Sequence, residues 1–204
     1  MESVKGFASK VNSEISSYFN KLVISKKSRI TSDIKMFVEK QLLVQPEIKA
    51  LIGDAGPNSL NAMLGISLSQ ATIAVNEIIG VISRSVRVDI KKFDKRLNGG
   101  VDLVFYDINL DEVTSLPSGS IEIIGGQLNW VNWLLTQGDT PVVVGFRYVA
   151  SSRGRTGGGI MQPGGSFRIP PAYSGTEGDN FITRALIGEQ QTKEITKIIN
   201  KVLF

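Results

Sequence analysis

The stretch Thr140–Pro170 reads TPVVVGFRYVASSRGRTGGGIMQPGGSFRIP, and it decides the fold of the second half of the chain. An apolar run, Thr140–Ala150, comes first, a glycine-rich segment, residues 151–165, follows, and Ser166–Pro170 closes the stretch. Runs rich in valine, isoleucine and aromatic residues and bounded by turn residues are typical of strands. We therefore expect two strands that pair as a long hairpin, with residues 151–165 as its tip.

The tip carries two arginines beside its glycines, a combination that often marks a phosphate-binding loop. A P-loop also requires a Lys-Ser/Thr pair and a following helix, and a dinucleotide-binding fingerprint requires the helix. Here the pair is missing, and Pro163 stands where the helix would begin. The remaining interpretations are an arm that docks onto a neighbouring protein, which we favour, and a flexible tip without function. The residues expected to make the docking contact are Arg153, Arg155, Gly157, Gly158, Gly159 and Arg168.

Apolar residues recur every three to four positions over most of the first 83 residues, which is the periodicity of amphipathic helices. Residues 2–24 form one such segment, and SKKSR (Ser25–Arg29) is expected to break it. A second helix is expected from about Thr31 to the region of Pro46, and residues 59–83 predict a buried helix.

From Ser85 the period changes to two, because apolar and charged residues alternate in VRVDIK (Val86–Lys91). This alternation predicts a half-buried strand. NGG (Asn98–Gly100) predicts a turn, and Val101–Ile108 predicts the returning strand. A second hairpin is therefore expected in the middle of the chain.

Two tryptophans, Trp130 and Trp133, lie in residues 125–138, which predict a short amphipathic helix bracketed by glycines. Tryptophans in such a place are core residues or anchors of a protein interface. Further on, Thr176 or Asp179 is the expected cap of another short helix, and a last helix closes the chain.

These elements predict an α+β fold. A helical N-terminal arm, residues 1–45, is expected to precede a core domain, residues 46–204. In the core, about four mostly antiparallel strands would form a sheet packed by helices, with the hairpin loop 151–165 projecting from it.

The chain has 204 residues and contains neither cysteine nor histidine. Their absence excludes disulfides, thiolate and imidazole metal ligands, cysteine nucleophiles and Ser-His triads. No apolar run is long enough to span a bilayer, and no signal-peptide core is present, so we expect a protein made in the cytoplasm with no membrane partner. We also expect no enzymatic activity, no catalytic residue, no cofactor and no metal.

Charged residues occur in blocks, although the net charge is only +4. Residues 84–96 hold six bases and two acids, and residues 97–140 hold six acids and no base. A basic strand opposite an acidic one would form favourable cross-strand pairs. Such blocks also suit nucleic-acid binding, head-to-tail pairing between copies, or solvated faces. The residues expected to pair between copies are Arg87, Lys91, Lys92, Asp102, Asp107 and Asp111.

Three segments, WVNWLLTQGDTPVVVGFRYV, SRGRTGGGIM and SFRIPPAYSGTEGDNFITRAL, resemble the neck and tail-completion proteins (head–tail connectors) of tailed bacteriophages. The resemblance runs from Gln127 to about Thr192, and QPEIKALIG and LNAMLGIS are similar to the middle region of those proteins. The N-terminal helical segment carries no such resemblance.

The resemblance implies a structural virion protein, because its motif block holds no catalytic residue. The chain would assemble as a homo-oligomeric ring, with six-fold symmetry as one arrangement, and would join the portal or adaptor to the tail proteins. Stopper, terminator and tail-completion roles stay open, and the loop arginines would meet an acidic neighbour or DNA in the lumen. The alternatives are a sequence-independent DNA-binding accessory protein and a metal-assisted hydrolase using Asp102, Asp107 and Asp111.

Overall fold

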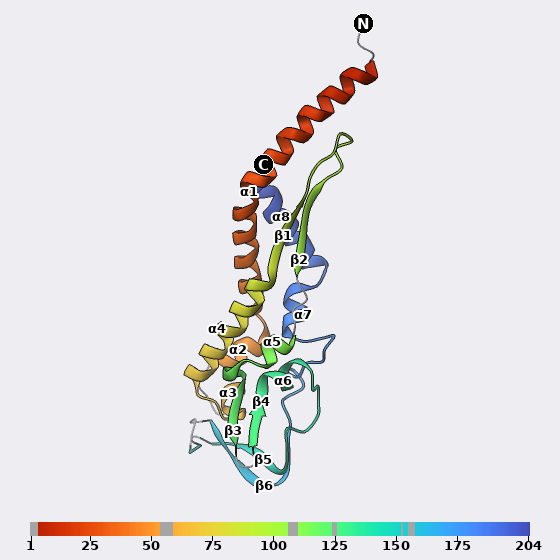
Figure 1. The fold of residues 1–204 in the computed structure, drawn as a ribbon. Coiled ribbons are helices and arrows are strands. Elements are labelled where there is room, and N and C mark those ends of the chain that lie inside the picture. Colours follow the sequence, from red (N-terminus) through yellow and green to blue (C-terminus); the bar gives the residue numbers. More distant parts are fainter. Residues whose placement is uncertain (1–3, 54–58, 106–109, 124–125, 152, 155–157) are drawn as a thin grey trace. The chain divides into compact units, whose positions relative to one another are not determined.

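A computed structural model describes residues 4–53, 59–105, 110–123, 126–151, 153–154 and 158–204 (Figure 1). Helices and antiparallel strands are both present, which confirms the expected mixture of helix and sheet. The chain divides into two compact units. Unit 1 comprises Met1–Phe37, Arg84–Asp107 and Glu189–Phe204, and unit 2 comprises Val38–Ser83 and Ile108–Gly188. The division of the chain at residue 45 stays a prediction.

The first helix, α1 (Val4–Leu43), is continuous. The expected break at Ser25–Arg29 is wrong, because this segment is polar but contains neither glycine nor proline. Ser25 and Thr31 instead donate their hydroxyls to the carbonyls of Leu22 and Lys27, so these side chains are accommodated within the helix. None of the described helices is long and apolar enough to cross a membrane.

Unit 1 contains an antiparallel hairpin, β1 (Val86–Lys91) and β2 (Gly100–Phe105), and the C-terminal helix α8 (Glu189–Leu203). Val86 and Val88 are buried, whereas Arg87 and Asp89, the charged residues that follow them, are exposed, as the alternation predicts. A hydrophobic contact ties the hairpin to α1, because the rings of Phe19 and Phe93 lie 5.6 Å apart.

Unit 2 holds most of the short elements of the chain. Its described elements are α2 (Pro46–Ile52), α3 (Leu60–Met63), α4 (Leu68–Ser85), α5 (Leu110–Thr114), the 3-10 helix η1 (Pro117–Gly119), β3 (Ser120–Ile123), β4 (Gly126–Asn129), α6 (Trp130–Leu135), β5 (Val143–Ala150), β6 (Gly159–Phe167) and α7 (Phe181–Leu186). The last two residues of α4 belong to unit 1 by the division above. The core of unit 2 forms around the large fully buried side chains of Trp130 and Phe181.

The six described strands pair as three separate two-stranded sheets, β1–β2, β3–β4 and β5–β6. A single sheet of about four strands is therefore not confirmed. The helix expected over residues 125–138 is shorter, because its first residues form β4 and pair with β3.

The long glycine-rich hairpin is present, but its tip is shorter than expected. β6 begins at Gly159, and Ile160 and Met161 already pair with Val149 and Tyr148 of β5. The ladder shifts register between Val144 and Phe146. Near this shift, Gly145, Gly164 and Gly165 have φ values of 86°, 97° and 79°, which favour glycine. These glycines therefore allow the irregular pairing of β5 with β6 and do not form a loop.

Candidate functional site

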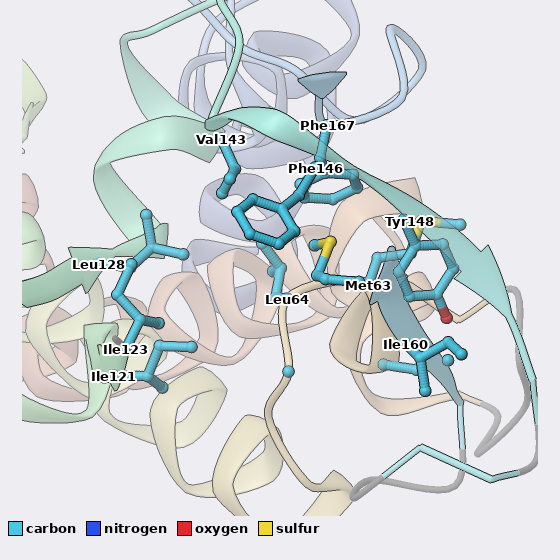
Figure 2. A pocket seen from close by; sticks show the side chains of 14 residues that line it. Met63, Leu64, Ile121, Ile123, Leu128, Val143, Phe146, Tyr148, Ile160 and Phe167 are labelled. Carbon is cyan, nitrogen blue, oxygen red and sulfur yellow. The ribbon is translucent and has the colours of Figure 1, made fainter. Parts of the chain in front are cut away.

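An apolar cavity of about 310 Å³ lies in unit 2, where the hairpins β3–β4 and β5–β6 face α3 (Figure 2). No charged side chain lines it, and Tyr148 supplies the one polar side chain among its lining residues. The Tyr148 hydroxyl donates to the Gly158 carbonyl at 2.6 Å, and burial raises the pKa of this phenol. Because the Tyr148 hydroxyl is hydrogen-bonded within its own hairpin, the cavity offers a mainly apolar surface to a ligand or partner.

Several lining side chains are also exposed to solvent. Phe146 is 44% exposed, and Ile123, Ile160 and Met161 are exposed around it. Val144, which precedes the register shift of β5, is 77% exposed. Exposed apolar residues scattered singly are ordinary, but apolar residues that surround one cavity are typical of a binding surface. We call the exposed lining residues Ile123, Phe146, Ile160 and Met161 the apolar rim; Val144 is exposed but does not line the cavity.

Gly159 of the expected docking loop lines this cavity, and Gly158 contacts one of its lining residues. The Gly158 carbonyl accepts the Tyr148 hydroxyl, and a Cβ added at Gly159 would collide with the Tyr148 ring. Arg153 is exposed near the tip, whereas Arg155 and Gly157 lie outside the described residues. The described glycines therefore hold the hairpin against Tyr148, a role that their sequence alone does not reveal.

Arg168, the last residue of the expected docking set, is engaged within its own unit. Its Nη1 lies 3.2 Å from an Asp139 carboxylate oxygen, and both side chains are exposed. The two tryptophans also differ from one another. Trp130 is 0% exposed and donates its indole N–H to the Ser118 carbonyl at 3.2 Å, so it is a core residue, whereas Trp133 is half-buried.

The charged residues expected to pair between copies lie in different units. Arg87, Lys91 and Lys92 are exposed in unit 1, as is Asp102, whereas Asp111 is exposed in unit 2. Asp107 lies outside the described residues. Within the hairpin, Asp102 stands opposite Asp89, so the cross-strand pair at this position joins like charges and the expected favourable pairing is wrong here. Among the residues that the structure describes, no cluster of three acidic residues could hold a metal ion.

The segment GDNFITRA (Gly178–Ala185) contains the start of α7 and one contact between α7 and α2. Asn180 caps α7, because its side-chain oxygen accepts from the backbone N–H groups of Ile182 and Thr183, so the cap is neither Thr176 nor Asp179. Thr183 returns the bond by accepting from the Asn180 N–H at 2.9 Å, which completes a capping box.

One turn further along α7, Arg184 binds two carboxylates. Its Nη2 contacts Glu47 of α2, and its Nη1 lies 2.6 Å from Asp179. Burial lowers the pKa of Arg184, but its hydrogen bonds and charge interactions with Asp179 and Glu47 raise it above the ordinary value. Sequence reasoning missed Glu47 and Arg184, because nothing near either residue signals a contact between α2 and α7.

The described chain is a protein of mixed helix and antiparallel sheet with an apolar cavity that no charged side chain lines. No protein-family model, curated protein or solved structure matches this chain.

Proposed function

We propose that the chain is a structural subunit of the head–tail neck of a tailed bacteriophage. It assembles with copies of itself as a ring and joins the portal or adaptor to the tail. Two lines of argument support the proposal: the resemblance of residues 127–192 to neck and tail-completion proteins, and the apolar rim with its cavity in the same part of the chain.

The apolar rim is the observation that carries the proposal. A cavity without a charged lining residue has no group that would act as a base, a nucleophile or a metal ligand, apart from the engaged Tyr148 hydroxyl. It does suit an aromatic or aliphatic side chain of a partner, because such anchors fill desolvated pockets at the centre of interfaces. Ring subunits need contacts between two different surfaces, and a cavity that receives a side chain from the next subunit is one such contact.

The motif block fits a structural role in the same way. Asn180, Thr183 and Arg184 direct their polar atoms into unit 2, where they cap α7 and bind Glu47 and Asp179. These groups therefore maintain the fold that presents the rim. Nothing in this arrangement calls for a substrate.

The oligomeric mass of the purified chain tests the proposal. Light scattering after size-exclusion chromatography should give a defined multiple of 22.2 kDa, alone or with the portal or adaptor protein. Phe146→Thr should weaken the association by at least about 30-fold, which corresponds to the loss of an interface hot spot. Phe204→Thr is the matched control, because Phe204 is 86% exposed and lies in unit 1.

A monomer at all concentrations, with and without the portal protein, would contradict the proposal. An equal loss of association in the Phe146→Thr and Phe204→Thr variants would mean that the apolar rim is not the assembly surface. Deletion of residues 154–165 is not a suitable test of docking, because it would remove most of β6 and with it a wall of the cavity. A deletion of residues 153–157 keeps both strands and the Gly158 carbonyl that accepts the Tyr148 hydroxyl.

A further inference from the structure

The turn of the β1–β2 hairpin carries a dense group of positive charges. Lys91, Lys92, Lys95 and Arg96 fall within six residues, and all four are exposed. We call these four residues the basic tip. From the structure we infer that the basic tip binds the phosphate backbone of double-stranded nucleic acid without reading its sequence, a function separate from the assembly surface of unit 2.

The two units differ in charge. Unit 1 has sixteen lysines and arginines against nine acids, a net charge of +7, whereas unit 2 has seven against ten, a net charge of −3. The surplus of positive charge that gives the chain its +4 thus lies wholly in unit 1. An extended polyanion would be attracted to that unit.

The basic tip has no salt-bridge partner among the residues that the structure describes. Five other bases of the described chain form salt bridges, each within its own unit: Arg29–Asp33, Lys193–Glu189, Lys197–Glu194, Arg168–Asp139 and Arg184 with Glu47 and Asp179. Four bases clustered within six residues at one hairpin turn form a compact positive patch that suits an external anion.

The one acid of the turn, Asp94, interacts electrostatically with Arg96 and leaves the four bases with a surplus of positive charge. Asp94 accepts the backbone N–H groups of Arg96 and Asn98 through one oxygen, at 2.7 and 2.9 Å. The Asp94 carboxylate thereby closes the turn, in which Leu97 adopts a left-handed φ of 62°. Its role is to shape the loop from which the bases project.

The turn is also fixed from α1. The Asn20 side chain donates to the Phe93 carbonyl at 3.0 Å and accepts the Phe93 N–H at 2.7 Å, so it satisfies both backbone groups of that residue. Phe93 packs against Phe19 in addition. Because the loop is ordered before binding, positioning the four bases on a phosphate backbone costs little further conformational entropy.

The chemistry of the turn favours a duplex over a single strand. Single-stranded nucleic acid is held by exposed aromatic rings on which its bases stack. Phe93 is the aromatic residue of the turn, and it is half-buried against Phe19. Contacts from lysine and arginine alone hold the phosphates and carry no base readout.

A second copy of the chain is a weaker candidate for the anion. The acids of unit 2 are largely engaged: Glu47, Asp139 and Asp179 pair with arginines, and Glu39 and Glu77 accept hydroxyls from Ser83 and Ser118. Among the described residues of unit 2, moreover, no three acids lie close enough together to hold a cation, so a concentrated negative patch to match the basic tip is lacking there. The arginines of the other hairpin were expected to meet either an acidic neighbour or DNA; of these, Arg168 pairs with Asp139 of its own unit.

Fluorescence anisotropy of a labelled 30-base-pair duplex of mixed sequence, titrated with the full chain at 50 to 300 mM salt, tests the inference. The variant carries Lys92→Gln, Lys95→Gln and Arg96→Gln. Its control carries Lys193→Gln, Lys197→Gln and Lys201→Gln on α8, which removes the same charge from the same unit. We expect the tip variant to weaken binding at least tenfold at 50 mM salt and to reduce the slope of log K against log salt by about 3, and the control to change binding less than about threefold.

Four outcomes would overturn the inference. They are no binding of the wild-type chain at 50 mM salt, equal losses in the two triple variants, competition by polyglutamate as effective as that by unlabelled duplex, and loss of self-association instead of DNA binding in the tip variant. Thermal unfolding checks that the tip variant is folded. If the tip variant is unfolded, the single variant Lys95→Glu replaces it in the same anisotropy titration, and the same outcomes apply. Because oligomeric mass is measured separately, failure of DNA binding leaves the neck proposal standing, and the reverse also holds.

Discussion

Arg184 of α7 binds Glu47 of α2, a residue 137 positions away in sequence whose carboxylate is fully buried. The second carboxylate oxygen of Glu47 has no hydrogen-bond partner in the described structure. A buried carboxylate that loses its counter-charge is costly, whereas the intact pair adds little net stability. The pair therefore makes the contact between α2 and α7 specific.

Arg184→Ala should lower the free energy of unfolding by about 2–3 kcal/mol, because it leaves Glu47 buried without a counter-charge. This loss of stability is smaller than the loss expected on breaking a fully buried ion pair, because the Arg184 side chain is 37% exposed. Urea unfolding measures it. Arg168→Ala removes an exposed pair and should cost less than about 1 kcal/mol, and Glu47→Leu with Arg184→Met should recover most of the loss. Equal costs for the two arginines would contradict this account.

Asp94 should titrate below the ordinary aspartate value of 3.8, because hydrogen bonds from the backbone of Asn98 and Arg96 lower its pKa. A lowered pKa means that the ionised carboxylate stabilises the turn above pH 3.8 and that this contribution is lost as the pH falls through the folded value. Backbone amide signals of Arg96 and Asn98 followed by NMR should report this midpoint. Asp94→Asn should abolish the transition and Asp111→Asn should not, and a midpoint at or above 3.8 would contradict the assignment.

Asp102→Lys should stabilise the chain by about 0.5–1 kcal/mol, because Asp89 stands directly opposite on the exposed face of the β1–β2 hairpin. Thermal unfolding at low salt measures the change, and added salt should reduce it. Glu122→Lys is the matched control, since Glu122 faces the neutral Gln127 in the β3–β4 hairpin. A destabilising Asp102→Lys, with an unaffected control, would show that the two aspartates do not repel.

Gly159→Ala should destabilise the chain by about 1–3 kcal/mol, because the added methyl group would collide with the Tyr148 ring. Gly100→Ala should change stability by less than about 0.5 kcal/mol, since a Cβ there meets nothing within 4 Å. In a Tyr148→Ala background the cost of Gly159→Ala should fall, and this coupling is read from a double-mutant cycle. Independent, additive effects would mean that Tyr148 is not what requires glycine here.

The elements that sequence reasoning predicted best are those in which burial alternates along the chain. Val86 and Val88 are buried, and the charged residues that follow them, Arg87 and Asp89, are exposed, so β1 followed directly from its pattern. The continuity of α1 did not follow, because a gap in apolar periodicity at Ser25–Arg29 resembles a break, although nothing there interrupts the backbone.

The cavity was beyond sequence reasoning because it depends on tertiary contacts. Glycine and proline in residues 159–165 indicate a turn, yet they form a strand once Tyr148 and Gly145 of β5 lie opposite them. The cap of α7 shows the same limit at short range. Thr176, Asp179 and Asn180 are all good caps, and only the packed position of α7 selects Asn180.

The central claim is that this chain is a subunit of the head–tail neck. Immunogold electron microscopy of purified phage particles, with an antibody raised against the whole chain, tests it most directly. The account predicts gold particles at the junction between head and tail of intact virions, and none along the tail or at its distal end. Purified particles that contain none of the chain, or that bind gold only elsewhere, would contradict it.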